Sequence, residues 1–414
     1  MRTMKTKPAL IGTSAGSTWL MAVLLLLALP AAVQAQFRCT TNNGTITISG
    51  YTGSGGAVTI PGTINGLPVT GIGNSAFSVI AIGNMMSFVA DKLTSVTIPD
   101  SVTSIGDRAF QRCSKLTSVK IGNGVINIGD YAFSECASLK SITIPDSVTN
   151  IGNWAFSSCS SLTNLAIGKG VTDIGREVFS SCGMTSVTIP NTVTSIGRRA
   201  FACCGLTGVT IGDHVTSLGG EAFTLCTSLT NVTIPGCVAS IGDAAFFGCD
   251  RLRNVVIANG VASIQDSAFS DCTNLTSITI GNGVTSIGEQ AFLECSRLNN
   301  VKIPNSVTNI GDSAFYDCTR LNNVTIGNGV ISIEHEAFAG CNMTSITIPD
   351  GVTSIGVRAF LHCTRLARIY FKGNAPNIGE SAFYGDTNTT AYYLPGKTGW
   401  GAKFGGRPTA LWKQ

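Results

Sequence analysis

A motif of about 23 residues recurs along most of this chain, and this periodicity constrains the fold more than any other feature. The segment from 298 to 318 is one copy. Its apolar residues are separated by short polar gaps; they are Leu298, Val301, Ile303, Val307, Ile310, Ala314, Phe315 and Cys318. Neither a helix, with a period of about 3.6, nor a strand, with a period of about 2, has this spacing. The motif therefore predicts one coil of a solenoid whose apolar residues share one interior.

An Ile-Gly pair, or a close variant of it, marks each copy. Its first residue, here called the anchor, stands at Ile72, Ile105, Ile128, Ile151, Ile174, Ile196, Leu218, Ile241, Ile264, Ile287, Ile310, Ile333, Ile355 and Ile378. Most steps between anchors are 23 residues, a few are 22, and the first is 33. A phenylalanine follows five residues after every anchor, which accounts for 14 of the 19 phenylalanines. We therefore expect about 14 coils of 22–23 residues.

The order of residues within one copy predicts the shape of the coil. Leu298, Val301 and Ile303 alternate with polar residues as in a strand that faces the core on one side. Pro304 then ends the strand, because proline has no N–H to donate. The segment from 312 to 315 is expected to form a short extended or helical turn. Stacked copies should form a parallel β-sheet on one face of the solenoid and such turns on the other.

These residues resemble the BspA-like class of leucine-rich repeat proteins. That repeat reads approximately Ile-Pro-x-x-Val-Thr-x-Ile-Gly-x-x-Ala-Phe-x-x-Cys-x-x-Leu, and the segment from Ile144 to Cys159 follows it without exception. The resemblance covers roughly residues 57–385. It implies a leucine-rich repeat fold and a secreted or surface protein that acts in adhesion or protein binding. It implies no catalytic residue.

The first 35 residues have the layout of a secretory signal peptide. A basic start is followed by the apolar run from Trp19 to Leu29 and by small residues that end at Ala35. The alternative is a membrane anchor, but the run is shorter than the roughly 20 residues that span a bilayer. We expect cleavage after about Ala35, and no later segment is apolar enough to span a membrane. The sequence therefore predicts a secreted or cell-surface protein.

Caps are expected at both ends of the solenoid, because terminal repeats expose apolar surface. In residues 36–56, alternating polarity follows a turn signal at Asn43 and Gly44, which predicts a β-hairpin cap. The solenoid is expected over residues 57–386 and a C-terminal cap over residues 387–414. Four aromatic residues are available to cover the last coil: Tyr393, Trp400, Phe404 and Trp412.

Twelve of the 15 cysteines stand in one column, on the C-terminal side of the Phe column. Because stacked residues lie about 4.8 Å apart, whereas a disulfide brings Cβ atoms to about 3.8 Å, we expect a ladder of reduced thiols. Disulfides and a metal site are the alternatives; the clustered cysteine spacings of metal sites do not occur. In the vicinal pair Cys203 and Cys204 we expect the side chains to face opposite sides.

Charge and motifs exclude several function classes. The formal net charge is +4, and removal of Arg2, Lys5 and Lys7 with the signal peptide leaves about +1. This predicts no nucleic-acid partner. The three histidines fall at different points of the repeat, and no catalytic or phosphate-binding motif occurs in a suitable context. We therefore expect that the protein is not an enzyme and that it binds neither a cofactor nor a metal ion.

The outward positions of the predicted strands carry hydroxyl and amide groups in columns. The candidate ligand-binding residues on this face are Asn231, Thr233, Asn254, Ser277, Thr279, Asn299, Asn300, Lys302, Asn322, Asn323 and Thr325. They predict a shallow binding surface for a protein or glycan. The alternative is a structural spacer in which these residues only keep the sheet soluble. The oligomeric state is left open.

One insertion interrupts the repeat. Residues 78–92 contain a ten-residue excess that is rich in apolar side chains. Two interpretations remain open at this point: a longer helix packed on the first coils, or an exposed apolar contact site.

Overall fold

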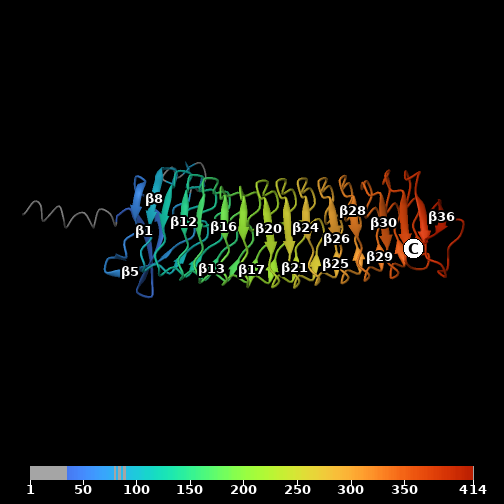
Figure 1. Cartoon of the computed structure of the whole chain (residues 1–414). Coiled ribbons are helices and arrows are strands. Elements are labelled where there is room, and N and C mark those ends of the chain that lie inside the picture. Colours follow the sequence, from blue (N-terminus) through green and yellow to red (C-terminus); the bar gives the residue numbers. More distant parts are fainter. Residues whose placement is uncertain (1–34, 79–80, 83–84, 87–89, 414) are drawn as a thin grey trace, which may run out of the picture.

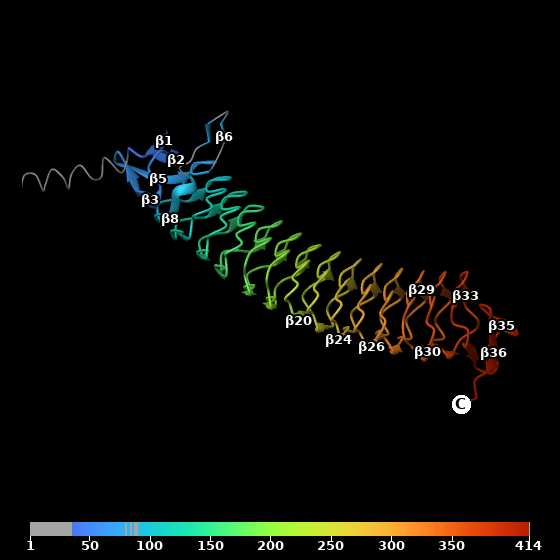
Figure 2. The ribbon, with the colours of Figure 1, turned by 90° about the horizontal axis from the view of Figure 1, so that it is seen from above.

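The computed structural model describes residues 35–78, 81–82, 85–86 and 90–413. They form an elongated, gently curved solenoid in which each coil stacks on the one before it (Figures 1 and 2). The fold is the predicted leucine-rich repeat solenoid, with about 15 turns. The predicted signal peptide falls almost entirely on residues 1–34, outside the described residues.

One side of the solenoid, here called the long-strand face, consists of parallel strands of three to five residues. These strands are β3 (Gly56–Thr59), β8 (Leu93–Thr97), β10 (Ser118–Lys120), β12 (Ser141–Thr143), β14 (Asn164–Ala166), β16 (Ser186–Thr188), β18 (Gly208–Thr210), β20 (Asn231–Ile234), β22 (Asn254–Ile257), β24 (Ser277–Thr279), β26 (Asn300–Lys302), β28 (Asn323–Thr325), β30 (Ser345–Ile348), β32 (Arg368–Phe371) and β34 (Thr390–Tyr393). In the coil around β26, Leu298, Val301 and Ile303 are buried as predicted. The strand ends before Pro304.

A second row of parallel strands lies on the opposite side and is built from the anchors (Figure 1). Its pairing is interrupted between β13 and β15, and it is here called the anchor sheet. Its strands are β5 (Leu67–Ile72), β9 (Ser104–Ile105), β11 (Asn127–Ile128), β13 (Asn150–Ile151), β15 (Asp173–Ile174), β17 (Ser195–Ile196), β19 (Ser217–Leu218), β21 (Ser240–Ile241), β23 (Ser263–Ile264), β25 (Ser286–Ile287), β27 (Asn309–Ile310), β29 (Ser332–Ile333), β31 (Ser354–Ile355) and β33 (Asn377–Ile378). The repeat thus forms paired strands on both sides, where the sequence predicted a sheet on one side and short extended or helical turns on the other.

The Phe column fills the interior. Consecutive rings from Phe77 to Phe383 stack with centroids between 4.7 and 5.6 Å apart. The rings of Phe110 through Phe360 in this column are fully buried. Aromatic pairs at such distances add to the stabilisation from burial. The regular step of the stack is set by the inter-strand spacing of the sheets.

The turn that carries the column phenylalanine, residues 312–317 in one coil and here called the Phe turn, is also joined from coil to coil by backbone hydrogen bonds. In most of these turns two non-glycine residues adopt a left-handed conformation; in one coil these are Ser313, with φ 52°, and Asp317, with φ 51°. In three turns the second of the two positions is a glycine instead, at Gly248, Gly340 and Gly385. This conformation is unfavourable for residues with a Cβ. Inter-coil hydrogen bonds offset its cost, since the Ser313 and Asp317 N–H groups donate to the carbonyls of His335 and Ala339 at 2.8 and 2.9 Å.

The column cysteines are free, and they form a ladder of their own. Each of the twelve thiols donates to the carbonyl of the column Phe in the preceding coil, at Sγ–O distances of 3.0 to 3.4 Å. Cys318, for example, donates to the Phe292 carbonyl at 3.2 Å. A buried thiol acts as a small hydrophobe and weak donor. Cys203 is exposed and Cys204 is buried, as predicted for that pair.

At the N-terminal end, β1 (Phe37–Asn42) and β2 (Thr45–Tyr51) pair as an antiparallel hairpin. Strand β2 also pairs in parallel with β5 and so extends the anchor sheet by one strand. The two-residue strand β4 (Thr63–Ile64) pairs antiparallel with β5.

The described residues of the insertion do not form the longer helix that was one of its two interpretations. Its described residues are β6 (Ala81–Ile82) and β7 (Met85–Met86), which pair antiparallel, and a short 3-10 helix, η1 (Ala90–Lys92). Figure 2 shows β6 standing away from the stacked coils. The described strands of the insertion therefore pair with each other and not with the strands of the coils.

At the C-terminal end, β36 (Arg407–Leu411) pairs in parallel with β34 and antiparallel with β35 (Lys403–Phe404). Phe404 and Trp400 lie against Phe371 with ring centroids at 5.2 and 4.8 Å. These rings cover the end of the core. Trp412 takes a different place: its ring lies against Tyr370 on the outward surface, at 4.9 Å.

Candidate functional site

All eleven predicted candidate residues are exposed, at or just before the strands of the long-strand face. Strand register aligns five of them in one row that crosses five coils: Asn231, Asn254, Ser277, Asn300 and Asn323. Within it, the Asn254 amide donates to the Asn231 side-chain oxygen at 2.7 Å.

The remaining candidate residues lie in two further rows. Thr233 and Thr279 share a row with Lys302 and Thr325, interrupted only by Val256 in β22. Asn299 and Asn322 occupy the position immediately before β26 and β28. The face therefore presents amides and hydroxyls in lines parallel to the long axis of the solenoid.

The candidate residues do not share one hollow. Asn231 and Thr233 line a hollow of about 390 Å³, while Asn323 and Thr325 line a separate one of about 350 Å³. Asn299, Asn300 and Asn322 line a third, of about 360 Å³. Asn254, Ser277, Thr279 and Lys302 line none of these three. The surface is an extended, shallow one, which suits a long ligand better than a small molecule.

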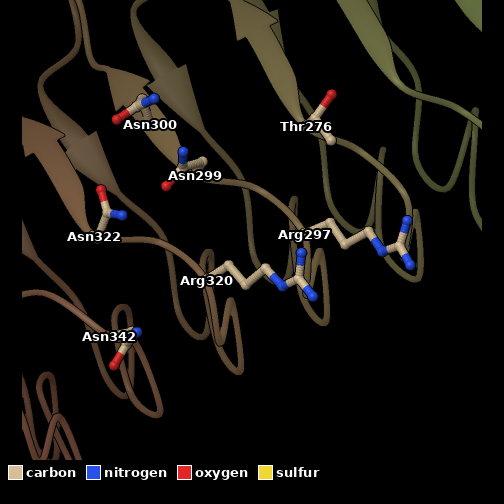
Figure 3. Close-up of a pocket in the computed structure, with 7 residues that line it drawn as sticks. All are labelled: Thr276, Arg297, Asn299, Asn300, Arg320, Asn322 and Asn342. Carbon is tan, nitrogen blue, oxygen red and sulfur yellow. The ribbon is translucent and has the colours of Figure 1, made fainter.

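The hollow at Asn299 contains residues that were not predicted from the sequence. Arg297, Arg320, Asn342 and Thr276 complete its lining. In Figure 3 the side chains of Arg297 and Arg320 extend in the same direction along the edge of the face. Each arginine stands immediately before the inward leucine of its coil, outside the strand. The sequence gives no signal for this position, because it lies before the alternation of inward and outward residues that predicts the strand.

The arginines of this hollow are free of ion pairs. The salt bridges of the described residues join other groups, such as Arg112 with Glu135, and include neither Arg297 nor Arg320. Carboxylates stand in the same coils on the Phe-turn side, at Asp271, Glu294 and Asp317. The pKa of Glu294 is raised by desolvation, by its two acidic neighbours and by a hydrogen bond with Asp271.

Aromatic residues border the C-terminal end of the face. Tyr370 in β32 stacks on Tyr392 in β34 at 5.3 Å and contacts Trp412. Trp412 and Lys372 line the hollow that contains Asn323. These rings are half-buried, and the part of an aromatic ring that stays accessible beside a cation can contact both apolar and polar ligand groups.

The cysteines are buried in a way that disfavours reactivity. Burial is the main cause that raises the pKa of Cys204, to about 12, and it also raises the pKa of Cys295 and Cys318 well above the ordinary value. Thiolates, which are the reactive form, are therefore suppressed. Among the residues that the structure describes, no three His, Cys, Asp or Glu side chains gather as around a metal ion.

Comparison with known families identifies the repeat. The BspA type leucine rich repeat region matches residues 81–207, 194–319 and 285–399. These matches cover well over half of the chain, so the protein belongs to the BspA-type leucine-rich repeat family. A comparison with curated proteins found no match.

Solved structures share the fold. A leucine-rich repeat protein from Bacteroides ovatus is 27% identical, with a TM-score of 0.64, over 91% of this chain and 98% of that one. The pneumococcal vaccine antigen PcpA is 20% identical, with a TM-score of 0.54, over 91% of this chain and 97% of its own. A leucine rich cell surface protein from Faecalibacterium prausnitzii is 26% identical, with a TM-score of 0.44, over 82% of this chain and 94% of its own.

In the part of the chain that the structure describes, no helix is long and apolar enough to cross a membrane.

Proposed function

We propose that this protein is exported and acts at or outside the cell surface as a non-enzymatic binding or adhesion protein, and that it binds a protein or glycan through the long-strand face. The observation that carries the proposal is the exposed rows of amides and hydroxyls on that face. Leucine-rich repeat families are generally non-catalytic binding modules. The predicted signal peptide supports export.

The shape of the face supports a long ligand. Its hollows are shallow and follow one another along the solenoid, and their polar groups repeat from coil to coil. Solenoids use such extended surfaces for binding. A rigid scaffold keeps the polar side chains in place, which reduces the entropy lost on binding.

The proposal is tested with arrays of extracellular proteins and glycans probed with the mature chain. Ligands bound by the wild type are tested again with the triple variant Asn299→Ala, Asn300→Ala, Lys302→Ala. We expect binding to weaken by about tenfold or more, because three exposed polar contacts are removed. The matched control is Asn127→Ala, Asn150→Ala, Lys169→Ala, which removes the same residue types outside the long-strand face.

A structural spacer is the second candidate function. It is favoured by the regularity of the long-strand face, since outward Thr and Ser residues suit exposed strands without any ligand. A wild-type protein that binds nothing on either array would support this function.

A further inference from the structure

We propose that the C-terminal half of the long-strand face binds a linear, negatively charged polysaccharide that runs along the solenoid axis. The inference rests on the proposed function and specifies its ligand. Six consecutive coils carry an arginine or asparagine immediately before the inward Leu or Met. This set, here called the basic row, is Arg251, Asn274, Arg297, Arg320, Asn342 and Arg365.

The basic row is confined to one half of the molecule. In the six coils before it, the same position holds small or hydroxyl residues in all but one case: Lys115, Ser138, Ser161, Gly183, Gly205 and Ser228. The fold does not require arginine at this position, since both halves bury their inward residue equally well; Leu162 and Leu298 are both fully buried. The difference between the two halves therefore points to a ligand and not to stability.

The four arginines of the basic row are available to an anion. Arg251, Arg297, Arg320 and Arg365 are all exposed, and in the described part of the chain none of them takes part in a salt bridge. No carboxylate stands at the outward positions of β22, β24, β26 or β28. Arginine binds carboxylate and sulfate groups through paired, charge-assisted hydrogen bonds.

The groups on either side of the basic row decide where on the surface the polysaccharide can lie. Beside the basic row lie the amides of Asn299 and Asn322, which share a hollow with Arg297 and Arg320 (Figure 3). Such amides both donate to and accept from sugar hydroxyls. On the other side of the row, Asp271, Glu294 and Asp317 repel an anion. The polymer is therefore held on the long-strand side.

The repeat of the surface favours a polysaccharide over an acidic protein segment. Two coils span about 10 Å, twice the strand spacing, which is comparable to the length of a disaccharide. A protein partner is usually anchored by aromatic or aliphatic groups in a buried pocket. The hollow at Arg297 offers Thr, Asn and Arg side chains and no apolar pocket. Tyr370 and Trp412 pack against each other at the end of the face and are half-buried, so the part of the Trp412 ring that stays accessible can contact a sugar.

The test measures the affinity of the mature chain for polygalacturonate, dextran sulfate, neutral dextran and poly-glutamate. We expect binding to polygalacturonate or dextran sulfate, weakened by added salt because counterions are released. Comparison of these two polymers distinguishes carboxylate from sulfate as the anion. Equal or tighter binding of poly-glutamate would assign the surface to an acidic protein segment and overturn the proposal.

Charge variants locate the site. The variant Arg297→Gln, Arg320→Gln, Arg365→Gln should bind the polyanion at least about tenfold more weakly. The control Lys115→Gln, Lys140→Gln, Lys169→Gln removes the same charge from the N-terminal half and should stay within about twofold of wild type. Equal weakening by both variants would show unspecific attraction and overturn the proposal.

The two proposals fail in different ways. If neither polyanion binds at low salt, the inference is overturned. The proposed function then still stands if a neutral glycan or a protein binds the wild type and is lost on changing Asn299, Asn300 and Lys302.

Discussion

At the scale of single residues, the last coil departs from the cysteine column. Asp386 stands eight residues after the anchor Ile378, where twelve of the other thirteen coils carry cysteine. Its side chain is fully buried. Burial raises its pKa to about 7, although the nearby charge of Arg407 acts in the opposite direction. The carboxyl group is therefore held protonated well above its usual range.

This predicts that the C-terminal coil loses stability as pH rises from about 4 to about 7. In that window the folded state binds the proton more tightly than the unfolded state, whose pKa is near 3.8, so the free energy of unfolding falls with pH. A shift of about three units corresponds to a loss on the order of 4 kcal/mol. Hydrogen exchange of residues 378–393, followed from pH 4 to 8, measures it.

Two variants serve as controls for this pH dependence. Asp386→Asn has no titrating group, and Asp386→Cys restores the column residue of the other coils. Both should flatten the profile, and an unchanged slope in both would assign the pH dependence to another group.

The cysteine ladder predicts selective thiol reactivity. In the native protein only Cys39 and Cys203 are exposed, and the column thiols are buried, with raised pKa values where a shift is resolved. A thiol reagent should therefore label about two cysteines quickly in the native state and all 15 after denaturation. Cys203→Ser should remove one fast site, whereas Cys204→Ser should remove none. Few titratable thiols in denaturant without reductant would contradict the reduced ladder.

At the scale of the single coil, stability depends on the stacked rings. Phe246 is fully buried between Phe223 and Phe269, and its ring centroid lies 5.3 Å from the centroid of each of these rings. Phe246→Ala should cost about 3–5 kcal/mol, because the cavity between two stacked rings cannot collapse. The loss should be felt mainly in adjacent coils, since a solenoid has contacts only between neighbours.

Hydrogen exchange measures this prediction coil by coil. Protection should fall around residues 223–269 and stay close to wild type at both ends. Phe247→Ala is the matched control, because Phe247 is only half-buried and its loss should cost less. A uniform loss of protection along the chain would refute the local model.

The length of a coil is also related to where the strand pairing of the long-strand sheet is interrupted. The long-strand sheet is interrupted between β14 and β16 and between β28 and β30. Both interruptions precede a strand whose coil has one residue fewer between the column cysteine and the inward methionine, at Cys182 and Met184 and at Cys341 and Met343. A third shortened coil, between Cys204 and Leu206, keeps its pairing, so one deletion alone does not break the sheet.

At the scale of the whole molecule, the ends of the solenoid need cover, because every coil exposes a cross-section of its core to the next. At the C-terminal end Phe404 is buried against Phe371 and Phe383, with ring centroids at 5.2 and 6.4 Å. Trp412 lies outside this contact, on the long-strand face.

We predict that Phe404→Ala destabilises the last coils by about 3–5 kcal/mol and exposes the end of the core. Hydrogen exchange of residues 366–393 should rise, and sedimentation should show association that increases with concentration. Trp412→Ala is the control and should leave the last coils protected. If both variants have the same effect, the two rings act together as one cap.

The sequence alone determined the repeat, the inward residues and the reduced cysteine column, because a 23-residue period has few ways to bury the same apolar pattern in every copy. It also placed the outward rows correctly, since alternation in a strand decides which side chains leave the core. On the other side of the solenoid the sequence predicted only short extended or helical turns and not the pairing of a second sheet, because two residues such as Asn309 and Ile310 are too short to show strand periodicity.

Only the tertiary structure decided which outward residues meet. Arg297 and Arg320 are 23 positions apart in the sequence, yet stacking brings both into one hollow with Asn299 and Asn342. The structure likewise placed Trp412 beside Tyr370 and paired β6 with β7 in the insertion. Periodicity fixes what a coil buries, whereas neighbours across coils depend on register, and register is a property of the stacked molecule.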